Sequence, residues 1–259
     1  MKLLATDFDG TLKFSDSVME SDLAAINEWR ARGDLFAIVT GRSLASIKKE
    51  ARNFNIPVDF FITNNGGMVF DADGNELLSS TLDTITAIDL MYLSHDYPDI
   101  VSFSVNDGKV RHKIDVHPQL EDHRYAHVAQ DWTEEEIMDS GRFAQIVFSC
   151  STPEAALELS DQLNQYFGSN IHAYANNFCV DIVPKGTSKA TGLEFVQSYT
   201  DVDDDDVFCM GDSYNDIPML SAYEHSATQA MAPAAVMESA PNSFVSLEDY
   251  VHAIDNGEV

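Results

Sequence analysis

Short apolar runs separated by amphipathic stretches dominate the first eighty residues of the chain. Leu3 to Thr6, Leu35 to Val39 and Phe60 to Ile62 are apolar without alternation, which is typical of strands covered on both faces. The stretches between them carry apolar residues at helical spacing, and we expect Ser21 and Ser43 to open the two helices. Strands and helices alternating in this order predict a parallel sheet with right-handed crossovers.

The alternation of apolar runs with amphipathic stretches stops after about residue 82 and resumes after Pro184. Between these points hairpin patterns mix with helical ones, which is typical of an antiparallel sheet carrying helices. A long polar stretch in this region contains Thr133, which we expect to cap a helix. The sequence therefore predicts an α/β fold with a Rossmann-like parallel-sheet core and an inserted α+β cap domain. The expected ranges are 1–81 for the first part of the core, 82–184 for the cap and 185–259 for the second part of the core.

Acidic and small polar residues follow the apolar strands of the predicted core. Asp7 and Asp9 come after the first strand, Thr40-Gly41 after the second, and Asp212 and Asp216 after the strand at 207–210. Because ligands of parallel sheets bind at the carboxyl ends of the strands, we expect these residues to lie together. Carboxylates this close repel one another, and Mg²⁺, which prefers a few carboxylates with water and phosphate oxygens, would relieve the repulsion. The sequence predicts a magnesium site.

The residue types around this site favour phosphoryl transfer. Of two carboxylates two residues apart, Asp7 can attack as a nucleophile while Asp9 gives a proton to a leaving group. Thr40 and Gly41 offer a hydroxyl and a backbone N–H at a helix start, which suits an anion. Lys189, near the start of the helix after the cap, can neutralise a transferring phosphoryl group. Each motif alone is common in turns and at exposed helix starts, and only their conjunction carries the inference.

The same motifs resemble those of the haloacid dehalogenase (HAD) superfamily, in its Cof type, subclass IIB, with a C2B cap. DFDGT at 7–11, TGR at 40–42, Lys189 at the end of 185–189 and GDSYND at 211–216 match its four motifs in order. The resemblance covers the whole chain, including NNGG near 64–67 and Ala-Met at 230–231. One departure is Ala232-Pro233-Ala234, where relatives often have Gly-Asn-Ala, and this removes a backbone N–H from a loop near the site.

The resemblance implies a role for each matching residue. Asp7 would form an aspartyl-phosphate, and Asp9 would act as general acid and then as base for water. Magnesium would be held by the Asp7 carboxylate, the Asp9 backbone carbonyl and Asp212, with Asp216 behind them or acting through water. Phosphate contacts are implied for the backbone of Phe8 and for Thr40, Gly41, Lys189 and Asn215.

The composition limits the classes of binding partner that the chain can have. The chain of 259 residues has 43 Asp and Glu against 15 Lys and Arg, a formal net charge of -28. This charge excludes binding to nucleic acid or to an anionic membrane by bulk electrostatics. Three cysteines without CxxC spacing fit a reducing compartment, and the apolar run before Asp7 is too short for a signal peptide. We therefore expect a cytoplasmic location.

The expected function is a magnesium-dependent phosphatase that hydrolyses a small phosphorylated metabolite, a sugar phosphate first of all, through an aspartyl-phosphate. The alternatives are a sugar-phosphate mutase with the same nucleophile, and a non-catalytic phosphosugar-binding module. Arg42 either contacts the phosphate site or pairs with an acid on the following helix. His123 and His127 either form a metal-binding pair or belong to a solvated polar loop. The sequence favours the solvated loop. The cap residues that set specificity and the oligomeric state stay open.

Overall fold

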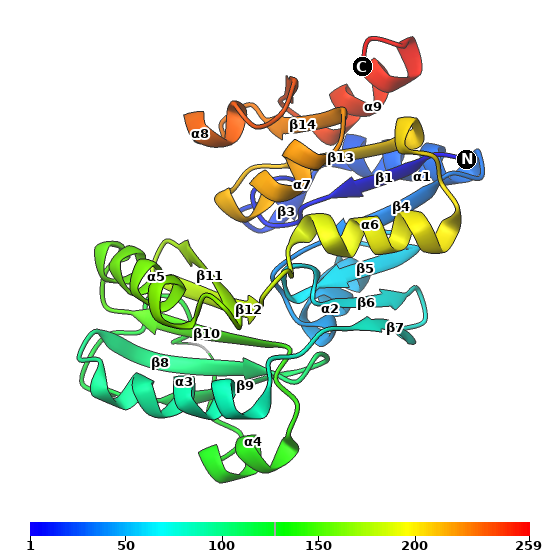
Figure 1. Cartoon of the computed structure of the whole chain (residues 1–259). Helices are drawn as coiled ribbons and strands as arrows, with labels where there is room; N and C mark the ends of the chain where they lie inside the picture. The colour runs from blue at the N-terminus through cyan, green and yellow to red at the C-terminus, as the bar shows by residue number, and fades with distance from the viewer. Residues whose placement is uncertain (127) are drawn as a thin grey trace. The chain divides into compact units, whose positions relative to one another are not determined.

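The computed structural model describes residues 1–126 and 128–259, so His127, one half of the histidine pair, lies outside the described residues. The chain divides into two compact units, unit 1 with residues 1–78 and 188–259 and unit 2 with residues 79–187 (Figure 1). Unit 1 is an α/β unit with a mostly parallel sheet, and unit 2 is an α+β unit inserted into it. The predicted fold class is confirmed.

Unit 1 is built on an eight-stranded sheet. Its strands, in spatial order, are β15 (Asn242–Phe244), β14 (His225–Gln229), β13 (Val207–Gly211), β1 (Leu3–Thr6), β4 (Leu35–Val39), β5 (Phe60–Thr63), β6 (Met68–Asp71) and β7 (Glu76–Ser79). The strand β1 pairs in parallel with both β4 and β13, so that Ala5 faces Ala37 and Cys209. The strand β6 runs antiparallel to β5. Every residue of β1 is buried, as an uninterrupted apolar run predicts for a strand covered on both faces.

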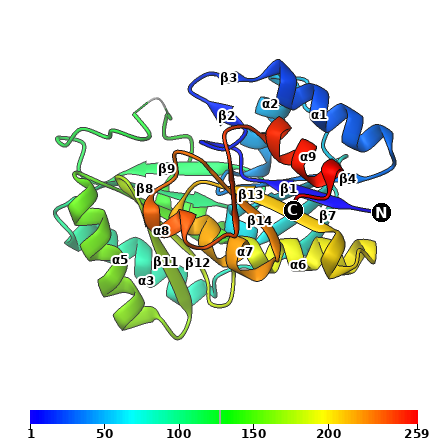
Figure 2. The same ribbon diagram turned by 90° about the horizontal axis from the view of Figure 1, so that it is seen from above.

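Helices cover both faces of this sheet (Figures 1 and 2). On one face lie α1 (Glu20–Ala31), α2 (Leu44–Asn53) and α9 (Leu247–Asn256), and on the other α6 (Lys189–Thr200) and α7 (Ile217–Ala222). Leu193 and Val196 of α6 pack with Leu3 and Ala5 of β1 in one apolar cluster. The short elements are the hairpin β2 (Lys13–Phe14) and β3 (Ser17–Val18), the helix α8 (Ala234–Met237), and the 3-10 helices η1 (Asn64–Gly66), η2 (Asp204–Asp206) and η3 (Tyr214–Asp216).

The start of α1 differs from the sequence-based expectation. The helix begins at Glu20 with Met19 as its N-cap, and no side chain caps it, so the prediction that Ser21 is the cap is wrong. Asp22 in the first turn is fully buried, and its Oδ1 accepts a hydrogen bond from the Glu248 N–H at 2.9 Å. A contact with the first turn of α9 therefore holds this helix end, and a local sequence motif does not report such a contact.

Unit 2 carries a five-stranded antiparallel sheet with helices on one face. Its strands, in spatial order, are β11 (Ile171–Asn176), β12 (Cys179–Pro184), β10 (Gln145–Cys150), β8 (Ile100–Asn106) and β9 (Arg111–Asp115). Alternate residues such as Phe103, Ile146 and Ile182 pack against α3 (Thr84–Asp96) and α5 (Pro153–Phe167). Thr133 caps α4 (Glu134–Ser140) through a capping box with Glu136, as predicted.

Asp122 holds part of the polar stretch after β9 against the face of this sheet opposite α3 and α5. Its carboxylate accepts hydrogen bonds from the hydroxyls of Ser102 (2.7 Å) and Ser149 (2.9 Å) and from the Tyr125 N–H (2.7 Å). Lys113 Nζ lies 3.0 Å from Asp122 Oδ2. Burial, the largest single influence, acts to raise the pKa of Asp122, but these hydrogen bonds together outweigh it and lower the pKa to about 2. Ionised Asp122 therefore anchors the start of the stretch, and Lys113 adds a hydrogen bond to the Tyr125 carbonyl at 3.1 Å.

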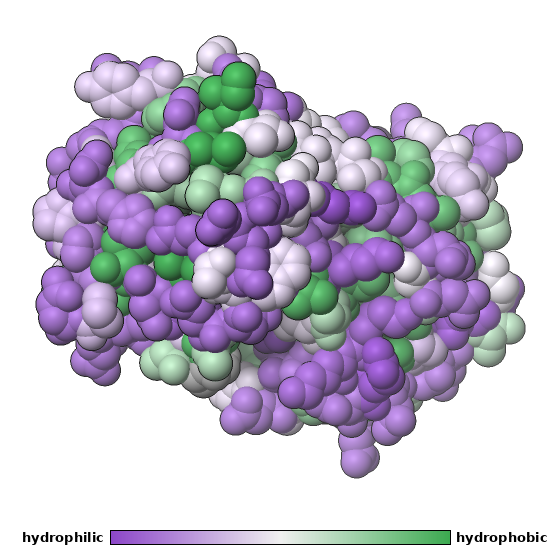
Figure 3. All heavy atoms as spheres, turned by 90° about the horizontal axis from the view of Figure 1, so that it is seen from below, coloured by the Kyte–Doolittle hydropathy of each residue, from purple (hydrophilic) through white to green (hydrophobic). Residues whose placement is uncertain are grey.

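The surface is largely hydrophilic. Hydrophilic residues cover most of the face drawn in Figure 3, and apolar residues show there as smaller separate patches. No helix among the described residues is long and apolar enough to cross a membrane.

Candidate functional site

Three carboxylates meet at the carboxyl ends of the parallel strands of unit 1. Asp7 follows β1, Asp212 follows the adjacent β13, and Asp216 lies in η3 just beyond. The side chains of these residues each offer an oxygen within 4.8 Å of the others. Adjacent parallel strands end at the same edge, which is why residues more than two hundred positions apart become neighbours.

Lys189 joins two of these carboxylates. It is the first residue of α6, and its Nζ lies 2.6 Å from both Asp7 Oδ1 and Asp216 Oδ1. Lys189 is 1% exposed and Asp216 is fully buried. The second oxygen of Asp216 accepts hydrogen bonds from the N–H groups of Asp212 (3.1 Å) and Ser213 (2.9 Å). Asp216 therefore has both oxygens engaged, and it holds Lys189 and the loop after β13 in place.

The cluster carries negative charge that its own cation does not balance. Burial raises the pKa of Asp7 well above its ordinary range despite the attraction of Lys189, and the charges of Asp216 and Asp212 add to the rise. Burial also raises the pKa of Asp212, against a hydrogen bond from Thr11 Oγ1 at 2.7 Å. Desolvation acts to lower the pKa of Lys189, but its two carboxylate partners raise it, so Lys189 stays charged. A further cation would stabilise the ionised carboxylates.

The donor set fits a hard divalent cation. All the donors are carboxylate oxygens. Asp7 accepts from Lys189, Asp212 accepts from Thr11, and the Asp7 and Asp212 side chains also contact each other. Gly10 makes room for this arrangement, because a Cβ on it would lie 2.4 Å from Asp212 Oδ2. The thiol of Cys209 is buried within β13. Asp7 and Asp212 are therefore the side chains that could hold the ion directly, with Asp216 behind them.

The Asp9 carboxylate lies outside that group of three and is held by Arg42. The guanidinium donates two hydrogen bonds to it, from Nε to Oδ2 (2.6 Å) and from Nη2 to Oδ1 (2.7 Å). Arg42 Nη1 also donates to Ser46 Oγ at 3.1 Å, which fixes the side chain along α2. From the sequence we expected Arg42 to contact the phosphate site or an acid on the following helix. The contact with Asp9 was not predicted. With its side chain bound to Arg42, Asp9 would offer a metal ion its backbone carbonyl.

The predicted phosphate-binding residues lie around the same edge. Thr40 is buried after β4, Gly41 follows it, and the Asn215 side chain in η3 donates from Nδ2 to Asn65 Oδ1 at 2.9 Å. A Cβ on Gly41 would lie 3.1 Å from that same Asn65 oxygen. Asn65 thus connects Gly41 with Asn215. The sequence marked it only as part of NNGG, without a role. Phe8 is fully buried next to Asp7.

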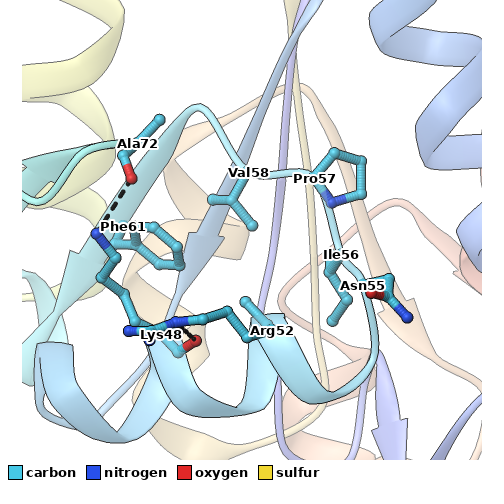
Figure 4. Close-up of a pocket in the computed structure, with 9 residues that line it drawn as sticks. Lys48, Arg52, Asn55, Ile56, Pro57, Val58, Phe61 and Ala72 are labelled. Atoms are coloured by element: carbon cyan, nitrogen blue, oxygen red, sulfur yellow. Dashed lines mark hydrogen bonds between the residues drawn. The ribbon is translucent and has the colours of Figure 1, made fainter.

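A hollow of about 400 Å³ over α2 is separate from this edge (Figure 4). It is lined by Ile56, Pro57, Val58 and Phe61, with Lys48 reaching across to donate to the Ala72 carbonyl at 3.2 Å. None of the acidic site residues lines it. The segment 232–234, where the sequence departs from the pattern of the family that it resembles, leads into α8, and Pro233 is the N-cap of that helix.

Comparison with known proteins gives consistent matches. The family model of haloacid dehalogenase-like hydrolases matches residues 4–253. An HMP-PP phosphatase of Cronobacter sakazakii is 27% identical over 224 residues, which is 85% of this chain and 80% of that protein. A HAD-superfamily phosphatase structure from Bacteroides thetaiotaomicron superposes with a TM-score of 0.82 at 23% identity, covering 100% of this chain and 96% of that one. A HAD subclass IIB sugar phosphatase gives 0.78 at 18% identity and covers 100% of both chains. At these identities the two structures show the fold.

Proposed function

The chain belongs to the haloacid dehalogenase-like hydrolases, the family that its motifs predicted, and from this premise we propose that it is a magnesium-dependent phosphatase of small phosphorylated metabolites. The observation that carries the proposal is Lys189, buried between Asp7 and Asp216 at 2.6 Å from each, with Asp212 in the same cluster. A sugar phosphate is the first substrate to test, and HMP-PP, named for the similar phosphatases, is the second.

The first half of the proposed reaction is phosphoryl transfer to the protein. A carboxylate oxygen of Asp7 attacks phosphorus while the bond from phosphorus to the leaving oxygen breaks. Asp9 gives a proton to that oxygen, so that the alcohol leaves neutral and an aspartyl-phosphate forms on Asp7. Lys189 fixes the orientation of the Asp7 carboxylate through Oδ1. Arg42 holds Asp9 as a carboxylate, so Asp9 would leave this ion pair and take up a proton from water before it acts as the acid. Magnesium, when bound, supplies positive charge that stabilises the negative phosphoryl oxygens.

The second half returns the protein to its starting state. Asp9 takes a proton from water as the water oxygen attacks phosphorus, and the bond between phosphorus and Asp7 breaks to release inorganic phosphate. Hydrogen-bond donors for the phosphoryl oxygens would come from Phe8 N–H, the Thr40 hydroxyl, Gly41 N–H, the Asn215 amide and Lys189. The N–H groups of Phe8 and Gly41 belong to backbone at the ends of buried strands, so they would need little reorganisation to donate during the reaction.

Replacement of the nucleophile tests this proposal. Asp7→Asn should abolish magnesium-dependent hydrolysis of 4-nitrophenyl phosphate by the purified protein, since an amide does not attack phosphorus. The matched control is Asp205→Asn, which removes the same charge from an exposed position in η2. If Asp7→Asn still turns over, the nucleophile assignment is wrong. If the wild-type protein itself releases no phosphate, a hexose phosphate assay distinguishes isomer formation by a mutase from a non-catalytic binding module.

We also infer that the protein works in the reducing environment of the cytoplasm. Cys150, Cys179 and Cys209 are all free thiols and all buried. Burial raises the pKa of the Cys150 and Cys179 thiols to about 12, so neither is a reactive thiolate. These cysteines behave as small apolar core residues.

A further inference from the structure

Asn65 is a buried side chain beside the phosphate-binding residues, in a backbone conformation that few residue types tolerate. It is 1% exposed, and its φ of 54° and ψ of 37° lie in the left-handed region, which Asn adopts more readily than most residues. The Asn65 N–H donates to the Thr40 carbonyl at 3.0 Å, and the neighbouring Asn64 N–H donates to the Arg42 carbonyl at 3.1 Å. Two backbone hydrogen bonds, one from each asparagine, therefore fix this segment to the loop that carries Thr40 and Gly41.

The amides of Asn65 and Asn215 form a pair with one hydrogen bond and two unused ends. Asn215 Nδ2 donates to Asn65 Oδ1, while Asn65 Nδ2 and Asn215 Oδ1 are buried and have no hydrogen-bond partner among residues 1–126 and 128–259. An unpaired buried N–H is costly and rare in folded proteins. In this orientation the end of the Asn215 amide that is not bound to Asn65 is an acceptor, and an acceptor repels a phosphate oxygen.

Turning both amides over by half a rotation keeps the bond between them and reverses its direction. Asn65 Nδ2 then donates to Asn215 Oδ1, and Asn215 Nδ2 becomes free to donate to an anion. The reversal exchanges amide nitrogen for oxygen at nearly the same positions, so it needs no displacement of the backbone. The buried group left unpaired is then a carbonyl of Asn65, which is tolerated better than an N–H.

We propose that Asn65 is a positioning residue that orients the Asn215 amide so that it donates to a phosphoryl oxygen. This inference rests on the proposed function and adds to it a residue that acts through Asn215. Gly41 supports the role, because its Cα leaves just enough room for the Asn65 amide and a Cβ there would lie 3.1 Å from Oδ1. The pair has two discrete arrangements, and the anion selects the one in which Asn65 donates.

Two substitutions separate this role from others. Asn65→Gly removes the amide and keeps the left-handed backbone free of strain. Asn65→Asp keeps the shape and the acceptor but removes the donor, so that Asn215 Nδ2 stays bound to residue 65. We expect Asn65→Gly to weaken inorganic phosphate binding about tenfold, as for the loss of a hydrogen bond to a charged group, and Asn65→Asp to weaken it more. KM for 4-nitrophenyl phosphate should rise in parallel, with a smaller change in kcat.

The deciding experiment is a double-mutant cycle with Asn215→Ala, read out by calorimetric titration of inorganic phosphate at saturating Mg²⁺. If Asn65 acts through Asn215, Asn65→Gly has no further effect in the Asn215→Ala background. If the losses of phosphate affinity in the two single variants multiply in the double variant, Asn65 contacts the anion itself. If Asn65→Gly binds phosphate within twofold of wild type, Asn65 has no role in binding. Either result overturns the proposal.

The control is Asn55→Gly, because Asn55 shares the φ of 54° but is exposed after α2. It should leave phosphate affinity unchanged. The binding readout does not depend on turnover, so wild-type protein that binds phosphate without hydrolysing esters would contradict the proposed function and leave this test intact. Wild-type protein that binds no phosphate would contradict the positioning role.

Discussion

Gly10→Ala is expected to disable the site by moving one carboxylate. A Cβ at position 10 would lie 2.4 Å from Asp212 Oδ2, whereas ordinary contacts begin near 3.4 Å, so the carboxylate must retreat by 1.0 Å. A misplacement of about 1 Å in a catalytic group costs roughly a hundredfold in rate. We therefore expect kcat/KM for 4-nitrophenyl phosphate to fall about a hundredfold, with half-saturation by Mg²⁺ moving to a higher concentration.

Backbone strain is the competing explanation, and Gly33 separates it from the steric effect. Gly10 has a φ of +96° and Gly33 a φ of +88°, so alanine at either position is strained by about 1–3 kcal/mol. Nothing lies within 4 Å of a Cβ built on Gly33. Gly33→Ala should therefore lower the melting temperature to a similar extent and keep full activity. If Gly10→Ala retains kcat/KM within about threefold of wild type, Asp212 does not need the position that the structure gives it.

Three further predictions concern Asp9, the Asp122 anchor and the net charge. Asp9→Asn removes the proton donor, so kcat should fall more for an alkyl phosphate than for 4-nitrophenyl phosphate, whose leaving group needs little protonation; equal losses would contradict the role of Asp9 as general acid. Asp122 has a pKa lowered to about 2, so it stabilises the fold fully above pH ~4 and loses the effect as pH falls through about 2. Asp122→Asn should cost about 2 kcal/mol in urea unfolding at pH 7 and about half of that at pH 3, and a pH-independent difference would argue against it. Because the net charge of -28 repels a phosphate dianion, KM should fall as ionic strength rises to about 0.15 M at saturating Mg²⁺; a steep rise in KM would refute this.

The sequence was sufficient for those features that depend on strand ends. Asp7 and Asp212 follow apolar runs, and the parallel order of the strands brings such ends together whatever the side chains between them do. The α/β core, the inserted α+β unit and the capping role of Thr133 also follow from local periodicity and local hydrogen bonding.

Features that depend on contacts between distant side chains were missed. The pairing of Arg42 with Asp9 joins two loops, and the anchoring of a polar stretch by Asp122 uses serines on two strands. The left-handed backbone of Asn65 is set by hydrogen bonds to another loop. The start of α1 is set by the contact of Asp22 with α9. None of these contacts has a period along the chain, so a pattern of hydrophobic and polar positions does not report them.

The division of unit 1 between two separate segments has a consequence for biosynthesis. The strand β1 pairs with β13, with Leu3 opposite Val207. This pairing forms only after about two hundred further residues have left the ribosome. Unit 2 is continuous from residue 79 to 187 and pairs only within itself in its sheet, so it can fold before β1 pairs with β13. Asp7 and Asp212 come together only when β13 docks. The nascent chain therefore acquires its cluster of carboxylates late, after the whole of unit 2 has been synthesised.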